Sequence, residues 1–229
     1  MTRSKRYLSI SNKIDFNQIY EMHDAVELLY NIKTAKFDET AECVFVLNVE
    51  HKKVDQHIRG SVVLPYGLGK KFCIVVIAQG EQAQKAQELG ADFVGDQELI
   101  RKISNGWTDF DVLISVSSFM PSLTKLGKLL GPKGLMPNPK LGTMTEDVEP
   151  IIKDIRKGRM EYKTDKFGNL HSVLGKLSFN KEQLTGNLVF LYNHLISIKP
   201  KTVKGEFIKN ITISSTMSPG IKVDLLSIR

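Results

Sequence analysis

Cysteine is scarce in this sequence, and long hydrophobic runs are missing. Only two cysteines occur among the 229 residues, Cys43 and Cys73, and no C-x-x-C pattern links them. Both stand in apolar, strand-like stretches, so we expect two buried, reduced thiols in a reducing compartment. This scarcity excludes a disulfide framework and a cysteine-rich zinc module as the basis of the fold.

No stretch is apolar enough, over enough residues, to span a bilayer, so no membrane partner is expected. The N-terminal segment MTRSKRYLSISNKID has basic residues but no apolar core, which excludes a secretory signal within it. Its Ser-rich, basic composition leaves an organellar origin open beside a cytoplasmic one. Hydrophobic residues make up 41% and charged residues 25% of the chain, which predicts a folded protein with one large or two modest cores.

The motifs of common enzymes and metal sites are also missing. Five histidines occur, among them His51 and His57, but none has metal-ligand spacing with a cysteine or belongs to an H-E-x-x-H pattern. In YGLGKK the glycines precede a strand-like run, whereas the dinucleotide fingerprint needs them after a strand. In GKLLGPKG, Gly134 follows Lys133 where a phosphate-binding P-loop has Ser or Thr. We therefore predict no catalytic residue, no cofactor and no metal.

The hydrophobic periodicity changes twice along the chain. A helix is expected to begin at Asp24, with Glu27 completing a capping box, and a half-buried strand is expected over residues 39–50. From residue 72 a continuous apolar run, FCIVVIA, is typical of a strand covered on both faces. Strand and helix then alternate three times, with the third helix over MPSLTKLGKLLG. This central pattern predicts a small parallel α/β layer.

From residue 146 onwards the pattern is antiparallel again. A helix ending at Gly158 is followed by two strands joined through DKFGN, a long amphipathic helix, and a last pair of strands joined through MSPG. The first segment has too few elements to close a sheet alone. Residues 1–66 and 159–229 are therefore expected to form one discontinuous domain, into which residues 67–158 are inserted. The glycines at the two crossings would suit a hinge; they are Gly67, Gly69 and Gly158.

The sequence carries a basic surplus, with a formal net charge of +7 and a pI near 9.3. Residues 67–158 are nearly balanced, with 12 Lys or Arg against 11 Asp or Glu. Residues 1–66 are balanced at 9 against 9, whereas residues 159–229 have 11 against 5. Binding to a polyanion is therefore expected on the discontinuous domain and not on the insert.

Two short stretches favour nucleic acid as that polyanion. TAKFDET places Lys36, Phe37 and Thr40 in a turn before a strand, where an aromatic ring can pack on a base or ribose while polar groups meet phosphates and 2′-hydroxyls. SSTMSPG places hydroxyl groups and a methionine at a turn between strands. Each has a plainer interpretation: Phe37 can be an ordinary core residue, and SSTMSPG can be a simple hairpin turn.

Several blocks together resemble a known family. The blocks are TAKFDET, DQHIRGSVVLP, ADFVG, DFDVLIS, GPKGLMPNPKLGT, DKFGNLHSVLGKLSF and ISSTM. In this order, over essentially the whole chain, they resemble the bacterial-type family of large-subunit ribosomal protein one (the L-one family). The resemblance implies an α/β protein of two domains: a discontinuous α+β domain with antiparallel strands, and an inserted Rossmann-like, three-layer α/β domain. It implies a role that is not enzymatic.

The resemblance also implies partners and a location. The protein is expected to bind large-subunit rRNA at the mobile stalk, beside the exit-site tRNA whose release the stalk assists after deacylation. Many bacterial members of the family also bind their own mRNA and repress its translation. A monomer within the ribosome is expected, in the cytoplasm or, as an alternative, in an organelle such as a plastid.

Residues that match the family's RNA contacts lie in both halves of the expected discontinuous domain. They are Glu27, Lys36, Phe37, Thr40, Asp165, Lys166, His171, Ser215, Thr216 and Met217. One departure is Ser218, where the family usually has Gly after Thr-Met. A side chain there could hinder a close approach of RNA to the backbone or a positive φ.

Residues 128–145, which include three Gly and three Pro, are expected to form a rigid corner with at most a peripheral RNA contact at Lys133 and Lys140. Two other functions stay open from the residues alone. One is a nucleotide-dependent or small-molecule enzyme that uses the α/β insert, although the phosphate loop is missing. The other is a translational repressor that acts only off the ribosome.

Overall fold

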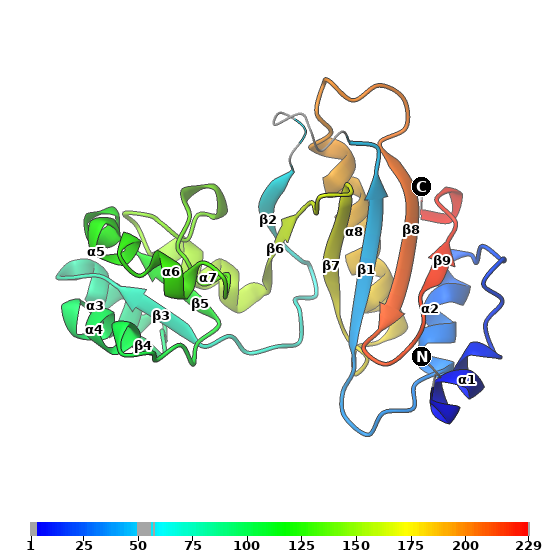
Figure 1. Cartoon of the computed structure of the whole chain (residues 1–229), viewed down its shortest axis with the longest axis horizontal. Coiled ribbons are helices and arrows are strands. Elements are labelled where there is room, and N and C mark those ends of the chain that lie inside the picture. The colour runs from blue at the N-terminus through cyan, green and yellow to red at the C-terminus, as the bar shows by residue number, and fades with distance from the viewer. Residues whose placement is uncertain (1–3, 50–55, 57, 229) are drawn as a thin grey trace. The chain divides into compact units, whose positions relative to one another are not determined.

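The computed structural model describes residues 4–49, 56 and 58–228, so His51 and His57 lie outside the described residues. The chain divides into two compact units. The discontinuous unit comprises Met1–Gly69 and Met160–Arg229, and the inserted unit comprises Lys70–Arg159. Figure 1 shows that chain segments from both ends interleave in one sheet of the discontinuous unit.

The discontinuous unit is built on a four-stranded antiparallel sheet in the order β7-β1-β8-β9. Its strands are β1 (Thr40–Leu47), β7 (Asn169–Lys176), β8 (Ile208–Ser215) and β9 (Ile221–Val223). Its helices are α1 (Lys5–Ser11), α2 (Met22–Asn31), α8 (Lys181–Ser197) and the short η4 (Leu226–Ile228). Helices α2 and α8 contact each other and pack on one face of the sheet (Figure 1).

The period of two in β1 decides which side chains form the core beneath these helices. Ala41, Cys43, Phe45 and Leu47 are buried, while the side chains between them are only partly covered or exposed. The alternation predicted from the sequence is therefore confirmed within the strand. Because β1 lies between β7 and β8, Phe45 sits at the centre of the sheet, opposite Leu170 and Ile211.

A separate two-stranded sheet pairs β2 (Arg59–Val63) with β6 (Arg159–Lys163). The two strands that the sequence predicts to be joined by DKFGN enter different sheets. They touch through an isolated bridge between Thr164 and Leu170, after which β7 joins β1. The turn itself forms, but the sheets that the two strands enter are determined by partners far away in the sequence.

The inserted unit contains a parallel sheet in the order β4-β3-β5. Its strands are β3 (Ile74–Ile77), β4 (Phe93–Gly95) and β5 (Val112–Ser115). Its α-helices are α3 (Glu81–Glu88), α4 (Gln97–Ser104), α5 (Met120–Thr124), α6 (Gly127–Leu130) and α7 (Glu149–Lys157), and its 3-10 helices are η2 (Ser117–Phe119) and η3 (Pro139–Leu141).

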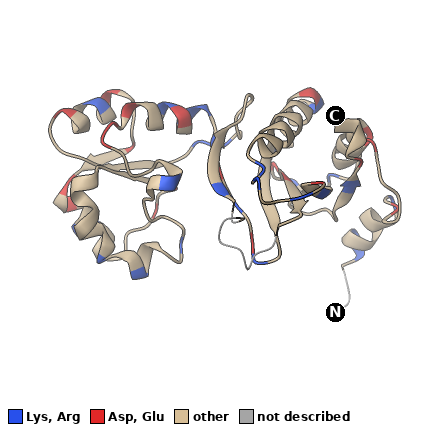
Figure 2. Ribbon diagram, turned by 90° about the horizontal axis from the view of Figure 1, so that it is seen from above, with Lys and Arg blue, Asp and Glu red and all other residues tan. Residues whose placement is uncertain are grey.

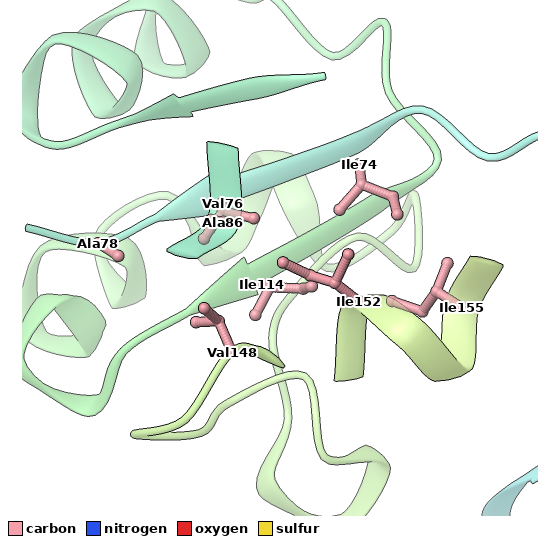
Figure 3. Close-up of a cluster of buried hydrophobic side chains, with 8 residues drawn as sticks. All are labelled: Ile74, Val76, Ala78, Ala86, Ile114, Val148, Ile152 and Ile155. Carbon is pink, nitrogen blue, oxygen red and sulfur yellow. The ribbon is translucent and has the colours of Figure 1, made fainter. Parts of the chain in front are cut away.

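Each face of this parallel sheet has its own hydrophobic cluster. Figure 3 shows Ile74 and Val76 of β3 pointing toward Ile114 of β5 and Ile152 of α7. The alternate residues of β3, Val75 and Ile77, pack in a second cluster with side chains from α4, α5 and α6. The strand is thus covered on both faces, as its continuous apolar run predicts. The predicted fold class, an antiparallel α+β domain with an inserted three-layer α/β domain, is confirmed.

Two helices differ from the expectation. Helix α2 begins at Met22 with Glu21 at the N-cap, and not at Asp24. The reason is a bridge of Tyr20 to Val223 in β9, because the chain turns into the helix directly after leaving the sheet. The third helix of the insert is broken into α5 and α6 just before Gly127, a residue that weakens helices.

The expectation that both thiols are buried is confirmed for Cys43 and wrong for Cys73. Cys43 is buried on β1, and burial raises the pKa of its thiol well above the usual value. Cys73 lies one residue before β3 and is only partly buried, so the prediction of two buried thiols is wrong for it. Within the described part of the chain, no helix combines the length and the apolar character needed to cross a membrane.

Candidate nucleic-acid interface

The face of the antiparallel sheet opposite α2 and α8 presents partly exposed side chains. On β1 these are Thr40, Glu42, Val44 and Val46, while α2 and α8 lie on the opposite face of the sheet (Figure 1). The strand register places His171 of β7 and Thr212 of β8 on either side of Val44, and Lys222 of β9 beside Thr212. We call this surface the open sheet face. It combines hydroxyl groups, small apolar side chains, the imidazole of His171, the ammonium group of Lys222 and the carboxylate of Glu42, and its hydroxyl and cationic groups suit contacts with ribose and phosphate.

At the start of β1 the two stretches that favour nucleic acid meet. The backbone N–H of Thr40 donates to Thr216 Oγ1 at 3.0 Å, and the N–H of Thr216 donates to the carbonyl of Thr40 at 3.1 Å. These residues are 176 positions apart in the sequence, so the fold alone brings them together. We call Lys36, Phe37, Thr40, Thr216 and Met217 the Phe37 end of the sheet.

Phe37 is exposed at this end. Its relative exposure is 52%, so the interpretation of Phe37 as an ordinary core residue is wrong. Thr216 is also exposed, and Met217 is half-buried beside it. An uncovered aromatic ring next to hydroxyl groups is an arrangement that can stack on an unpaired base.

Lys176 and Glu27 complete the surroundings of this end. Lys176 Nζ donates to Thr40 Oγ1 at 2.8 Å, which places a cation among the hydroxyl groups. Glu27 is exposed on α2 and forms an ion pair with Lys181 at 3.0 Å, at the start of α8. The sequence analysis missed Lys176; the only signal for it was its position in the strand that follows DKFGN.

Glu39 was also missed, and it lies directly beneath the Phe37 end. Its side chain has a relative exposure of 1%. Oε2 accepts hydrogen bonds from the Ser215 hydroxyl at 2.6 Å and from the N–H of Met217 at 3.1 Å, and Oε1 accepts from the N–H of Ala35 at 3.2 Å. An acidic residue just before a strand gives no sequence signal of burial.

Hydrogen bonds stabilise the charged form of the Glu39 carboxyl group. Burial by itself raises the pKa of a carboxyl group, because it disfavours the charged form. Here the hydrogen bonds from Ser215, Met217, Ala35 and Thr34 outweigh burial and hold the pKa below its usual value. The side chain is therefore an ionised carboxylate, and Ser215, which is itself buried, uses its hydroxyl to bind it.

A second group of predicted residues lies at the other end of β1. The turn that contains Asp165, Lys166 and Phe167 is attached there, because Leu47 N–H donates to the carbonyl of Gly168. We call this group the Phe167 end. An eight-residue strand is about 25 Å long, so the predicted site residues form two groups and not one. His171 lies between them on the open sheet face.

Asp165 shapes this turn. Oδ1 accepts from the N–H of Phe167 at 2.8 Å and from that of Asn169 at 2.7 Å, and Oδ2 accepts from the Asn169 amide at 3.0 Å. Burial raises the pKa of Asp165, but these hydrogen bonds and nearby His171, whose Nε2 is 3.7 Å from Oδ2, lower it overall. The turn leaves Lys166 exposed and Phe167 with 83% relative exposure, an aromatic residue that the sequence analysis missed.

Ser218 fits the turn after β8 without strain. Its hydroxyl accepts from the N–H of Ser215 at 2.8 Å, and its own N–H donates to the carbonyl of Ser215 at 3.1 Å. Among the described residues only glycines have a positive φ, so Ser218 does not occupy the conformation that would require glycine. The side chain closes the turn from within, and the expected strain at this position is absent from the structure.

The distribution of charge and of metal-ligating side chains can be read from the structure. Basic and acidic residues are interspersed along the helices of the inserted unit (Figure 2), in line with its nearly balanced charge. Within the described ranges, no three His, Cys, Asp or Glu side chains are grouped so that they could hold a metal ion.

Comparison with known proteins gives the family. Residues 29–219 match the model of the ribosomal protein L1p/L10e family. The chain belongs to this family. It is 53% identical over 228 residues to the large ribosomal subunit protein uL1 of Phytoplasma australiense, and the match covers 100% of both chains. It is 48% identical over 222 residues to the uL1 protein of Thermosipho melanesiensis, covering 96% of each chain.

A third relative, the uL1 protein of Persephonella marina, is 46% identical over 230 residues, which cover 99% of this chain and 95% of that protein. The family resemblance inferred from the sequence blocks is therefore confirmed. Membership makes the chain a structural, non-enzymatic protein of the large ribosomal subunit, associated there with rRNA. The enzyme interpretation of the insert is wrong, and the ribosomal location is confirmed.

The lysines of the Gly- and Pro-rich loop belong to the inserted unit of this family member. Lys133 Nζ donates to the Thr108 hydroxyl, and Lys140 is exposed on η3. The loop packs back on the unit, since Leu141 and Thr143 are buried and Met144 forms a parallel bridge with Ser115 of β5. Its geometry is that of a fixed corner.

Proposed function

We propose that this protein binds the stalk region of large-subunit rRNA through the discontinuous unit, with the Phe37 end as the principal contact. The observation that carries this proposal is the mutual hydrogen bonding of Thr40 and Thr216, which joins the segment of the exposed Phe37 to the turn of Thr216. Stacking on Phe37 and hydrogen bonds from the hydroxyl groups recognise an unpaired base and its 2′-hydroxyl.

Lysines supply the part of the affinity that depends on salt. Lys36 at the Phe37 end and Lys166 at the Phe167 end are both exposed, and Lys222 lies on the open sheet face between the two ends. Each phosphate neutralised by a lysine releases counterions, so affinity falls as salt rises. The surface from one end of β1 to the other thus offers RNA a stacking site and a line of cations.

In this proposal, some of the residues that the resemblance assigns to RNA binding do not touch RNA themselves. Ser215 and Asp165 use their side chains within the protein, on Glu39 and on the turn respectively. Glu27 already pairs with Lys181, so its carboxylate faces a cation of its own chain. In this proposal Ser215 and Asp165 hold Thr216 and Lys166 in place, and the exposed neighbours touch RNA.

The glycines proposed as a hinge have conformations that other residues rarely adopt. Gly67, Gly69 and Gly158 have φ values of 68°, 69° and 102°. Gly158 ends α7 in the left-handed conformation typical of helix C-termini. We keep a hinge at these positions as a proposal, supported by their place at the two crossings between the units.

Two further activities are part of the proposal. We propose that the protein, as a monomer within the ribosome, assists the release of deacylated tRNA from the exit site. We also propose that it represses translation of its own mRNA. The support is the family, together with the proposal that stalk rRNA and mRNA use the same surface of the discontinuous unit. Stalk rRNA is then expected to displace the mRNA in a competition assay; if both bind together, the shared surface is excluded.

Sedimentation of a cell extract tests where the protein acts. If the proposal holds, most of the protein travels with large subunits, and high salt weakens this association because contacts of lysines with phosphate supply part of the affinity. A protein that stays mainly at the top of the gradient at low salt would favour a repressor that acts off the ribosome.

Replacing both Lys133 and Lys140 with alanine is expected to change the affinity for stalk rRNA less than about threefold. Both lysines lie in the inserted unit, whose charge is nearly balanced, and not at the proposed principal contact. Even if they touch phosphate, removing one such contact typically changes binding only modestly. Filter binding at two salt concentrations measures the effect. A loss as large as that of Phe37→Ala would move the principal site to the insert.

A further inference from the structure

Apart from Thr40, which begins β1, the Phe37 end lies in two segments without regular secondary structure. Residues 33–39 lead from α2 into β1, and residues 216–220 lead from β8 into β9. Such segments normally lose conformational entropy when they become ordered on a ligand. In the structure both segments are hydrogen-bonded to the buried carboxylate of Glu39, in addition to the bonds between Thr40 and Thr216.

Each oxygen of this carboxylate accepts hydrogen bonds from a different segment. Oε1 accepts from the N–H of Ala35, two residues before Phe37. Oε2 accepts from Ser215 and from the N–H of Met217, which flank Thr216. One side chain thus connects the loop that carries the aromatic ring to the turn that carries the hydroxyl and the methionine.

We propose that Glu39 is a positioning residue for RNA binding: it locks the loop of Phe37 and the turn of Thr216 in the geometry that RNA recognises. This inference rests on the proposed function of the Phe37 end. Glu39 does not touch RNA in the proposal, because it is buried under the two segments. It acts by orienting the residues that do.

The choice of a charged group is consistent with this role. A buried carboxylate is costly unless its oxygens are fully hydrogen-bonded, and here backbone N–H groups and a hydroxyl from both segments supply those bonds. Movement of either segment would leave the charge partly unsatisfied. A positioned site binds more tightly than a mobile one because less entropy is lost on binding.

Replacing Glu39 with glutamine tests the proposal. Glutamine has nearly the same shape but only one acceptor oxygen, so its NH₂ group must face N–H or O–H donors of one segment. That segment then loses its hydrogen bonds to residue 39 and becomes more mobile. The dissociation constant for a transcript of the stalk rRNA region is therefore expected to rise on the order of tenfold. Binding is measured with the full chain at a temperature where circular dichroism shows that each variant is folded.

Asn187→Asp is the matched control. Asn187 is buried in α8, where its amide donates to the carbonyls of Leu174 and Gly67 at 2.7 Å and 3.1 Å. The exchange of amide for carboxylate is again isosteric and again creates a buried mismatch, but Asn187 bonds to neither segment of the Phe37 end. We expect it to destabilise the fold while it changes RNA affinity less than about twofold in the folded protein.

Coupling to Phe37 separates positioning from general stability. If Glu39 acts by orienting the Phe37 loop, Phe37→Ala costs less affinity in the Glu39→Gln background than in the wild type, by about threefold or more. In the Asn187→Asp background the cost of Phe37→Ala is unchanged. Hydrogen exchange of the Ala35 and Met217 amides in the free wild type gives a second measurement, and both are expected to be protected.

The outcomes distinguish failure of the proposed RNA-binding function from failure of the positioning role of Glu39. If the wild type does not bind the transcript, or Phe37→Ala has no effect, the proposed function fails and the role of Glu39 fails with it. If Phe37→Ala weakens binding but Glu39→Gln does not, or both buried variants weaken it equally, only the role of Glu39 is overturned. Unprotected Ala35 or Met217 amides overturn it even if Glu39→Gln does not fold.

Discussion

Phe37→Ala is expected to raise the dissociation constant for stalk rRNA by about 10- to 100-fold. The ring is half exposed in the free protein, so its removal leaves no cavity and should change the free energy of unfolding by no more than about 0.5 kcal/mol. A base stacked on an aromatic side chain contributes about 1–3 kcal/mol, or about 5- to 150-fold in affinity, and the expected loss lies within that range. Isothermal titration or filter binding with the full chain measures it.

Phe190→Ala is the matched control. Phe190 is an exposed aromatic residue of α8, on the helical side of the discontinuous unit, with 40% relative exposure. Its removal is expected to leave RNA affinity unchanged. The salt dependence provides an additional check, because Phe37→Ala removes no charge and should leave the slope of affinity against salt concentration unaltered. Equal losses for the two variants would show that stacking at the Phe37 end is not specific.

The sequence predicts the architecture because periodicity is a local signal. The alternating residues of β1 and the continuous apolar run of β3 each indicate how many faces of a strand are covered. A boundary that depends on long-range pairing is predicted wrongly: the start of α2 is fixed by the bridge between Tyr20 and Val223. The sequence also does not indicate which sheets β6 and β7 enter, because their partners β2 and β1 are far away in the chain.

The candidate site was predictable only in part, for the same reason. Phe37 and Thr216 were found because aromatic and hydroxyl residues at turns suggest RNA contacts and because the family blocks contain them. Glu39 was not found, since its role comes from burial and from partners 176 and 178 positions away. Phe167 was passed over because only the structure shows that its ring is uncovered.

Phe45→Ala is expected to lower the free energy of unfolding of the discontinuous unit by about 3–5 kcal/mol. Phe45 is fully buried at the centre of the sheet, and truncating a buried phenylalanine removes apolar contacts and leaves a cavity. Domains are typically stable by only about 5–15 kcal/mol, so a large part of the stability is lost. Thermal unfolding followed by circular dichroism measures this, and RNA binding is expected to disappear at the temperature where the unit unfolds.

Ile152→Ala is the counterpart in the inserted unit. Ile152 is fully buried on α7 against Ile74 and Ile114 (Figure 3), and its truncation is expected to cost about 2–5 kcal/mol in that unit. Because the two units have separate cores and the proposed RNA surface belongs to the discontinuous one, RNA affinity should persist while hydrogen exchange in the insert accelerates. Loss of RNA binding in this variant, with the amides of β1 and β8 still protected, would show that the insert contributes directly to the RNA site.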